Sequence, residues 1–109
     1  MSIHLIVQEV PEQPKNLRIN AQQSRSLQLT WSQPFAGNSP IEEYHIQYKL
    51  ISEIWQNCER LSVTGSQTVV NINNLHPAKA YHIRMAAENK LGSSEFSEVV
   101  EITTLEEGM

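Results

Sequence analysis

The sequence predicts an all-β fold, a sandwich of seven short antiparallel strands, and three observations lead to this prediction. Apolar and polar residues alternate with a period of two along most of the chain, as in half-buried strands. Turn-forming residues separate these runs, and no run has a helical period. The spacing Leu75-x-Pro77-x-x-x-Tyr81 is typical of a tyrosine corner, in which the ring packs in the core and the hydroxyl bonds to backbone just upstream.

The first half of the chain supplies a short strand-like start and three strands. The start, Ile3–Val7, alternates until Pro11 and Pro14 end the pattern, since proline cannot donate to a ladder. A break rich in proline and glycine at residues 34–40 separates the second strand from the third. The apolar positions of the three strands are Leu17 and Ile19, then Leu27, Leu29 and Trp31, then Tyr44, Ile46, Tyr48 and Leu50.

The second half supplies the remaining four strands. Between Ile51 and Val63 the alternation is poor, and we expect a short edge strand at about Trp55–Arg60. Residues 65–66 turn the chain, and residues 89–94 form a loop before the last strand. The apolar positions of the other three strands are Val70 and Ile72, then Tyr81, Ile83, Met85 and Ala87, then Val100 and Ile102.

Composition limits the class of protein. The 109 residues suit one domain, large enough to fold without disulfides or a metal. The net charge of -4 and the absence of a basic patch argue against nucleic acid as a partner. No stretch approaches the roughly 18 apolar residues of a membrane span. The single cysteine, Cys58, cannot form an internal disulfide, so it does not decide the redox compartment.

Several positions together resemble the fibronectin type III domain. They are Trp31, Tyr44-x-Ile46-x-Tyr48, Leu75-x-Pro77-x-x-x-Tyr81, Ala87-x-Asn89-x-x-Gly92 and Ser97. The resemblance implies an immunoglobulin-like sandwich over residues 11–105, followed by a tail at 106–109. It also implies that six of these residues are structural, namely Trp31, Tyr44, Tyr48, Leu75, Pro77 and Tyr81.

A narrower resemblance rests on the loop Pro34–Ile41 and on the strand that follows it. Both are similar to the type III repeats of neural adhesion receptors of the Down syndrome cell adhesion molecule and sidekick kind. Residues 1–10 resemble the last strand of a preceding immunoglobulin-like domain. We therefore expect this lead-in to be mobile here, or ordered only by contact with another molecule. Giant muscle proteins carry Gly-x-Ser-Pro-Ile at the same loop, which keeps a second parent open.

The resemblance implies a non-enzymatic module in the extracellular part of a membrane-anchored cell-surface receptor. Such a module would mediate protein–protein contacts in cell adhesion and fix the geometry between adjacent domains. Homophilic contacts are a further expectation, and the isolated domain is expected to be a monomer with no cofactor. The alternative function is an intracellular structural repeat of a muscle-type filament protein.

Candidate site residues are few. His45 and His82 could face each other and bind zinc, but we expect solvated histidines, since a closed site needs four ligands. Cys58 could form an intermolecular disulfide, although an inert thiol is the favoured interpretation. Trp55 is a candidate interface residue because tryptophan is enriched at hot spots, and packing over the sheet edge is its alternative. No catalytic, cofactor or metal site is assigned.

Two segments are compared with recognition motifs of the resembled family. The loop Asn89–Ser94 lies where some type III domains carry Arg-Gly-Asp, and it lacks that motif. Integrin binding by that route is therefore not supported, and Lys90 and Leu91 are retained as candidate interface residues. The segment Glu95–Glu98 lies where class I cytokine receptors carry Trp-Ser-x-Trp-Ser, and it lacks both tryptophans.

Overall fold

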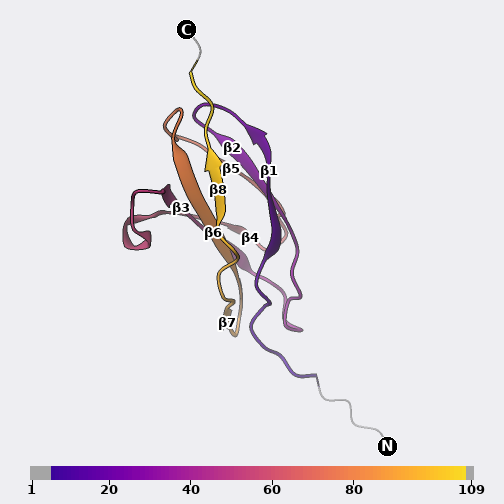
Figure 1. The fold of residues 1–109 in the computed structure, drawn as a ribbon. Coiled ribbons are helices and arrows are strands. Elements are labelled where there is room, and N and C mark those ends of the chain that lie inside the picture. Colours follow the sequence, from indigo (N-terminus) through magenta and orange to yellow (C-terminus); the bar gives the residue numbers. More distant parts are fainter. Residues whose placement is uncertain (1–5, 108–109) are drawn as a thin grey trace, which may run out of the picture.

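Two antiparallel sheets packed face to face make up the computed structural model, which describes residues 6–107 (Figure 1). One sheet has the order β1-β2-β5, and the other has the order β4-β3-β6-β7, with β8 also pairing with β6. The predicted all-β antiparallel sandwich is confirmed. The strands are β1 (Lys15–Gln22), β2 (Leu27–Ser32), β3 (Glu43–Leu50), β4 (Glu59–Thr64), β5 (Val69–Ile72), β6 (Ala80–Asn89), β7 (Gly92–Ser93) and β8 (Val100–Thr103).

Residues 6–107 contain eight strands where seven were predicted, because Gly92–Ser93, predicted as part of the loop at 89–94, forms the short strand β7, while the last predicted strand is β8. Residues 94–99 between them leave the regular ladder, but two serines keep this segment bonded to β6. The N–H groups of Ser94 and Ser97 donate to the carbonyls of Ala87 and Met85, each at 2.7 Å. In return, the N–H of Ala87 donates to the Ser94 hydroxyl at 2.9 Å, and the N–H of Met85 donates to the Ser97 hydroxyl at 3.0 Å. Side chains thus replace ladder bonds between β7 and β8.

The predicted edge strand at Trp55–Arg60 is wrong in position. Trp55–Asn57 forms a short 3₁₀ helix, η1, and the edge strand β4 pairs with β3 from Glu59 to Thr64. The N–H of Cys58 donates to the carbonyl of Trp55 at 3.2 Å, so the backbone here bonds locally instead of to a neighbouring strand. A tryptophan favours a strand by propensity, but in this loop tertiary contacts of its ring decide the conformation.

The core lies between the two sheets and is centred on an aromatic pair. Trp31 on β2 and Tyr44 on β3 pack edge to face, with ring centroids 5.2 Å apart and an interplanar angle of 63°. Leu75 and Tyr81 are also buried, whereas Tyr48 is partly exposed. Burial raises the pKa of the Tyr44 phenol above its ordinary value, because the charged form would lose its hydration.

Tyr81 ties the start of β6 to the loop before it. Its hydroxyl accepts a hydrogen bond from the backbone N–H of His76 at 2.8 Å, while its ring is buried. This is the geometry of a tyrosine corner. Pro77, in the same loop, is partly buried.

Tyr81→Phe should lower the free energy of unfolding by about 0.5–1.5 kcal/mol, because it removes the hydroxyl and keeps the ring. Equilibrium urea unfolding measures the change. Tyr48→Phe is the matched control, since the hydroxyl of Tyr48 has no hydrogen-bond partner among residues 6–107. A Tyr81→Phe protein no less stable than Tyr48→Phe would contradict the structural role of the corner.

The described chain enters and leaves the sandwich at opposite ends (Figure 1). The entry end carries the lead-in, the loop between β2 and β3, and the turn between β6 and β7. The exit end carries residues 104–107, which follow β8. No helix in the described range 6–107 is long and apolar enough to cross a membrane.

Candidate interface at the entry end

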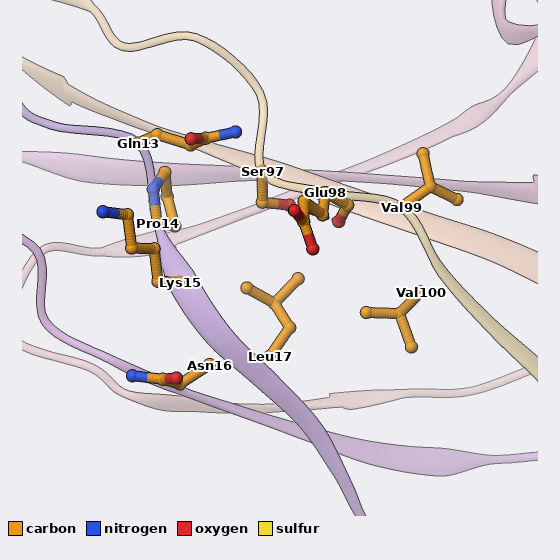
Figure 2. Close-up of a pocket in the computed structure, with 9 residues that line it drawn as sticks. All are labelled: Gln13, Pro14, Lys15, Asn16, Leu17, Ser97, Glu98, Val99 and Val100. Atoms are coloured by element: carbon orange, nitrogen blue, oxygen red, sulfur yellow. Dashed lines mark hydrogen bonds between the residues drawn. The ribbon is translucent and has the colours of Figure 1, made fainter.

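A cleft of about 420 Å³ opens on the side of the sandwich, between β1 and the segment that leads into β8 (Figure 2). Its lining contains neither histidine nor cysteine, and the Ser97 hydroxyl within it already accepts a hydrogen bond from Met85. The cleft therefore offers no nucleophile paired with a histidine base. Its lining residues are Gln13, Pro14, Lys15, Asn16, Leu17, Ser97, Glu98, Val99 and Val100.

The lead-in bonds to the domain itself, contrary to expectation. The N–H of Glu9 donates to the carbonyl of Gly37 at 2.9 Å, and just after the lead-in the N–H of Glu12 donates to the carbonyl of Phe35 at the same distance. The Asn38 side chain donates to the carbonyl of Val7 at 2.9 Å. The described part of the lead-in thus lies along the β2–β3 loop without forming a strand. Residues 1–5 of the predicted strand-like start lie outside the described residues, and its origin in a preceding domain stays a prediction.

Asn89, the last residue of β6, is the centre of this contact. It is 2% exposed, and its amide nitrogen donates to the carbonyls of Glu9 at 2.7 Å, Ala36 at 2.9 Å and Ser39 at 3.4 Å. Its amide oxygen accepts from the N–H of Leu91 at 2.9 Å. One side chain therefore joins the lead-in, the β2–β3 loop and the β6–β7 turn.

Gly37 lets the lead-in approach the β2–β3 loop. Its φ of +74° lies in the left-handed region, and a Cβ placed on it would lie within 3 Å of the carbonyl oxygens of both Glu9 and Val10. A side chain there would collide with backbone, which cannot rotate away. The backbone contact between the lead-in and this loop therefore requires glycine.

Besides Ile6, the first described residue, four exposed apolar side chains lie on these three segments of the entry end. Val7 and Val10 come from the lead-in, Phe35 from the β2–β3 loop and Leu91 from the β6–β7 turn, and each has at least 40% of its surface exposed. Lys90, beside Leu91, is also exposed. We call the four apolar residues the apolar cap. The apolar cap includes Leu91, which the sequence analysis named as a candidate interface residue, and three residues that it did not name.

Trp55 lies away from this end, on the outward face of the sheet that contains β3 and β6. The Arg84 guanidinium lies 4.0 Å from the ring centroid of Trp55 and 4.0 Å from that of Phe96, and is thus stacked between them. The Lys49 ammonium lies 4.8 Å from the Trp55 centroid. Such contacts suit a ring that packs over charged side chains, so Trp55 as an interface residue stays a prediction.

The structure does not support the other two chemical roles considered for the sequence, a zinc site at His45 and His82 and an intermolecular disulfide at Cys58. His45 and His82 are not opposite each other, because His45 pairs with Ala86 and His82 pairs with Lys49 in the β3–β6 register. The alternative in which the two histidines share one zinc ion is therefore wrong. Cys58 is buried at 8% exposure, which does not suit an intermolecular disulfide.

Comparisons with known proteins agree on one family. The sequence profile of the fibronectin type III domain matches residues 12–103. Cell adhesion molecule Dscam1 of Drosophila melanogaster is 45% identical over 106 residues, which is 97% of this chain and 5% of that protein. Human cell adhesion molecule DSCAML1 is 44% identical over 107 residues, 95% of this chain and 5% of that protein. The chain thus spans about a twentieth of the length of these relatives.

Solved structures share the fold. A solution structure of the type III domain of human contactin 1 superposes with a TM-score of 0.83 at 22% identity, covering 99% of this chain and 90% of that one. A crystal structure of titin domains A168–A170 gives a TM-score of 0.79 at 28% identity, covering 90% of this chain and 33% of that one.

Proposed function

Since the chain belongs to the fibronectin type III family, we propose that it is a non-enzymatic module of a cell adhesion receptor that fixes the direction of its neighbouring domains. The parent is a membrane-anchored cell-surface protein, and this module lies in its extracellular part. Adjacent domains of the same chain are its protein partners, and it contacts a second receptor only as part of a longer array. The isolated domain is a monomer.

The observation that carries this proposal is that the described chain is hydrogen-bonded to the sandwich near both limits of the range 6–107, at opposite ends of the domain. At the entry end, Asn89 and Gly37 hold the lead-in, as described above. At the exit end, the N–H of Leu105 donates to Gln23 at 3.2 Å, and Glu107 pairs with Arg25 at 2.6 Å. A neighbour attached through a strapped segment inherits a direction as well as a distance, unlike one attached through a flexible linker.

The apolar cap gives the preceding domain a surface to rest on. Its four side chains come from the three segments that meet at the entry end, where the lead-in enters the domain, so a domain attached there would lie close to them. Exposed apolar residues that gather at one end of a domain favour protein contact. An interface between domains of one chain needs only a modest area, because the linker already raises the effective concentration.

The filament-repeat alternative has weaker support. Identity to the adhesion molecules reaches 45% over nearly the whole chain, whereas the titin domains share 28% with it. The shared sandwich does not distinguish the two functions, because one fold serves many functions.

The test uses this domain joined to the domain that precedes it in the parent protein. We expect small-angle scattering and residual dipolar couplings to report one preferred orientation of the two domains. Replacing Phe35 and Leu91 by serine should broaden that orientation and increase the spread of inter-domain distances. Val99→Ser is the matched control, because Val99 is exposed at 47%, close to the 46% of Leu91, and lies in the side cleft. Free rotation of the two wild-type domains would contradict the proposal.

A further inference from the structure

Three potential metal ligands meet on the outward face of β3 and β6. The Nε2 atom of His45 lies 3.4 Å from a carboxylate oxygen of Glu88 and 3.8 Å from one of Glu43. All three donor atoms lie within 4.8 Å of one another. Donors bound about 2.0–2.2 Å from a tetrahedral zinc ion are about 3.3–3.6 Å apart. The cluster is therefore close to the spacing that such an ion needs, before any side chain rotates.

The strand register holds the two carboxylates together. Glu43 and Glu88 are direct cross-strand partners, and His45 follows two positions along β3 on the same face. Like charges directly opposite each other destabilise a sheet. A divalent cation between the two carboxylates would remove this repulsion and leave the group neutral. Strands also place ligands more accurately than loops do.

A neighbouring strand orients the histidine for this role. Ser62 on β4 is the cross-strand partner of His45, and its hydroxyl lies 3.0 Å from Nδ1. A metal-binding histidine usually uses its other ring nitrogen in such a hydrogen bond, which fixes the ring and its tautomer. Nε2 is thereby directed toward the two carboxylates. Ser93 on β7 also donates, at 3.4 Å, to the Glu88 oxygen that lies nearest His45.

We propose that Glu43, His45 and Glu88 bind a divalent transition-metal cation of the zinc class, with water in the fourth position. Imidazole with carboxylates suits Zn²⁺ and Cu²⁺, whereas Mg²⁺ and Ca²⁺ prefer oxygen ligands alone. The side chains are one-third to one-half exposed, so an ion can enter without movement of the backbone. This site borders the entry end, since Glu88 directly precedes Asn89, but it shares no residue with the apolar cap and does not rest on the function proposed above.

His82 provides an internal comparison on the same face of the sheet. It lies 2.9 Å from a single carboxylate, that of Glu101. Its Nδ1 faces the Lys49 ammonium at 3.4 Å, which repels a cation. His82 thus has the chemistry of a surface ion pair, and within the range 6–107 it has no second acidic ligand.

Zinc titration of the intact chain, followed by NMR of the histidine rings, tests the proposal. We expect Zn²⁺ to shift the signals of His45 at lower concentration than those of His82, and equal amounts of Mg²⁺ to shift neither. His45→Ala should weaken binding at least about tenfold, and Ser62→Ala should weaken it by up to about tenfold, as loss of an orienting partner does. His82→Ala is the matched control and should leave the affinity unchanged.

Two results would overturn the site. One is equal zinc affinity of the wild type and His45→Ala, which would locate the ion elsewhere. The other is wild-type affinity in Glu43→Gln and Glu88→Gln, which would show that the carboxylates do not bind it. These variants change exposed side chains, so their fold can be verified from unchanged amide spectra before metal is added.

Discussion

Trp31→Ala should lower the free energy of unfolding by about 3–5 kcal/mol, the range for removing a large aromatic side chain from a core. Trp31 lies on β2, the central strand of its sheet, and is 5% exposed. Its ring packs edge to face on Tyr44 from the opposite sheet. The substitution therefore opens a cavity between the sheets and removes the aromatic pair. Equilibrium urea unfolding measures the change.

The second tryptophan provides the control. Trp55→Ala makes the same chemical change on the outward face, where the partly exposed ring contacts the charged groups of Arg84 and Lys49. Cation–π contacts of this kind contribute about 0.5–2 kcal/mol each, so the loss should be smaller than at Trp31. A Trp31→Ala protein as stable as the wild type, or more stable than Trp55→Ala, would contradict the assigned core.

The parts of the fold that the sequence predicted depend on local patterns. Alternation with a period of two locates most strands, since each buried face needs apolar residues at every second position. The tyrosine corner is similarly local, because Tyr81 bonds to a residue only five positions away. The short strand β7 was not predicted, because it pairs with β6 at only two positions and serine hydroxyls substitute for backbone partners in the segment that follows. Nothing in the alternation of residues 94–99 distinguishes that arrangement from a loop.

The missed features all depend on contacts between distant residues. Arg84 is stacked between Trp55 and Phe96, which lie 29 and 12 positions away. The segment Glu95–Glu98 lacks the tryptophans of class I cytokine receptors, but its Phe96 was a usable signal, because any aromatic ring can stack on a guanidinium. The Glu43, His45 and Glu88 cluster needed the β3–β6 register, which the sequence did not define. The Glu-x-His spacing on one face of a strand was its only local signal.

The role of Asn89 shows the same limit at the candidate interface. The sequence placed it in the Asn-x-x-Gly pattern of the resembled family, but its three carbonyl partners come from residues 50 to 80 positions away. The lead-in was expected to lack a partner within this domain because its alternation resembles a strand. Its backbone instead bonds to an irregular loop, an arrangement that side-chain periodicity does not reveal.

Asn89→Ala should lower the free energy of unfolding by about 2–4 kcal/mol, since several buried polar groups lose their partner at once. The side chain is nearly fully buried and makes four hydrogen bonds. The loss should be accompanied by faster amide exchange at Leu91, whose N–H the side chain accepts. Urea unfolding and native-state hydrogen exchange measure the two effects.

Deletion of residues 1–10 distinguishes the bond that Asn89 makes to the lead-in from the bonds that it makes to the β2–β3 loop. The deletion removes the Glu9 carbonyl and the lead-in's bonds to Gly37 and Asn38, and should itself cost about 0.5–1.5 kcal/mol for each hydrogen bond lost. If Asn89 holds the lead-in, Asn89→Ala should then cost less in the shortened chain than in the intact one, by at least about 0.5 kcal/mol. Equal costs in both backgrounds would show that Asn89 stabilises only the loops, and the strapped entry end would lose its main support. A coupled result would mean that the direction of the incoming chain is set by the same buried side chain that closes this end of the sandwich.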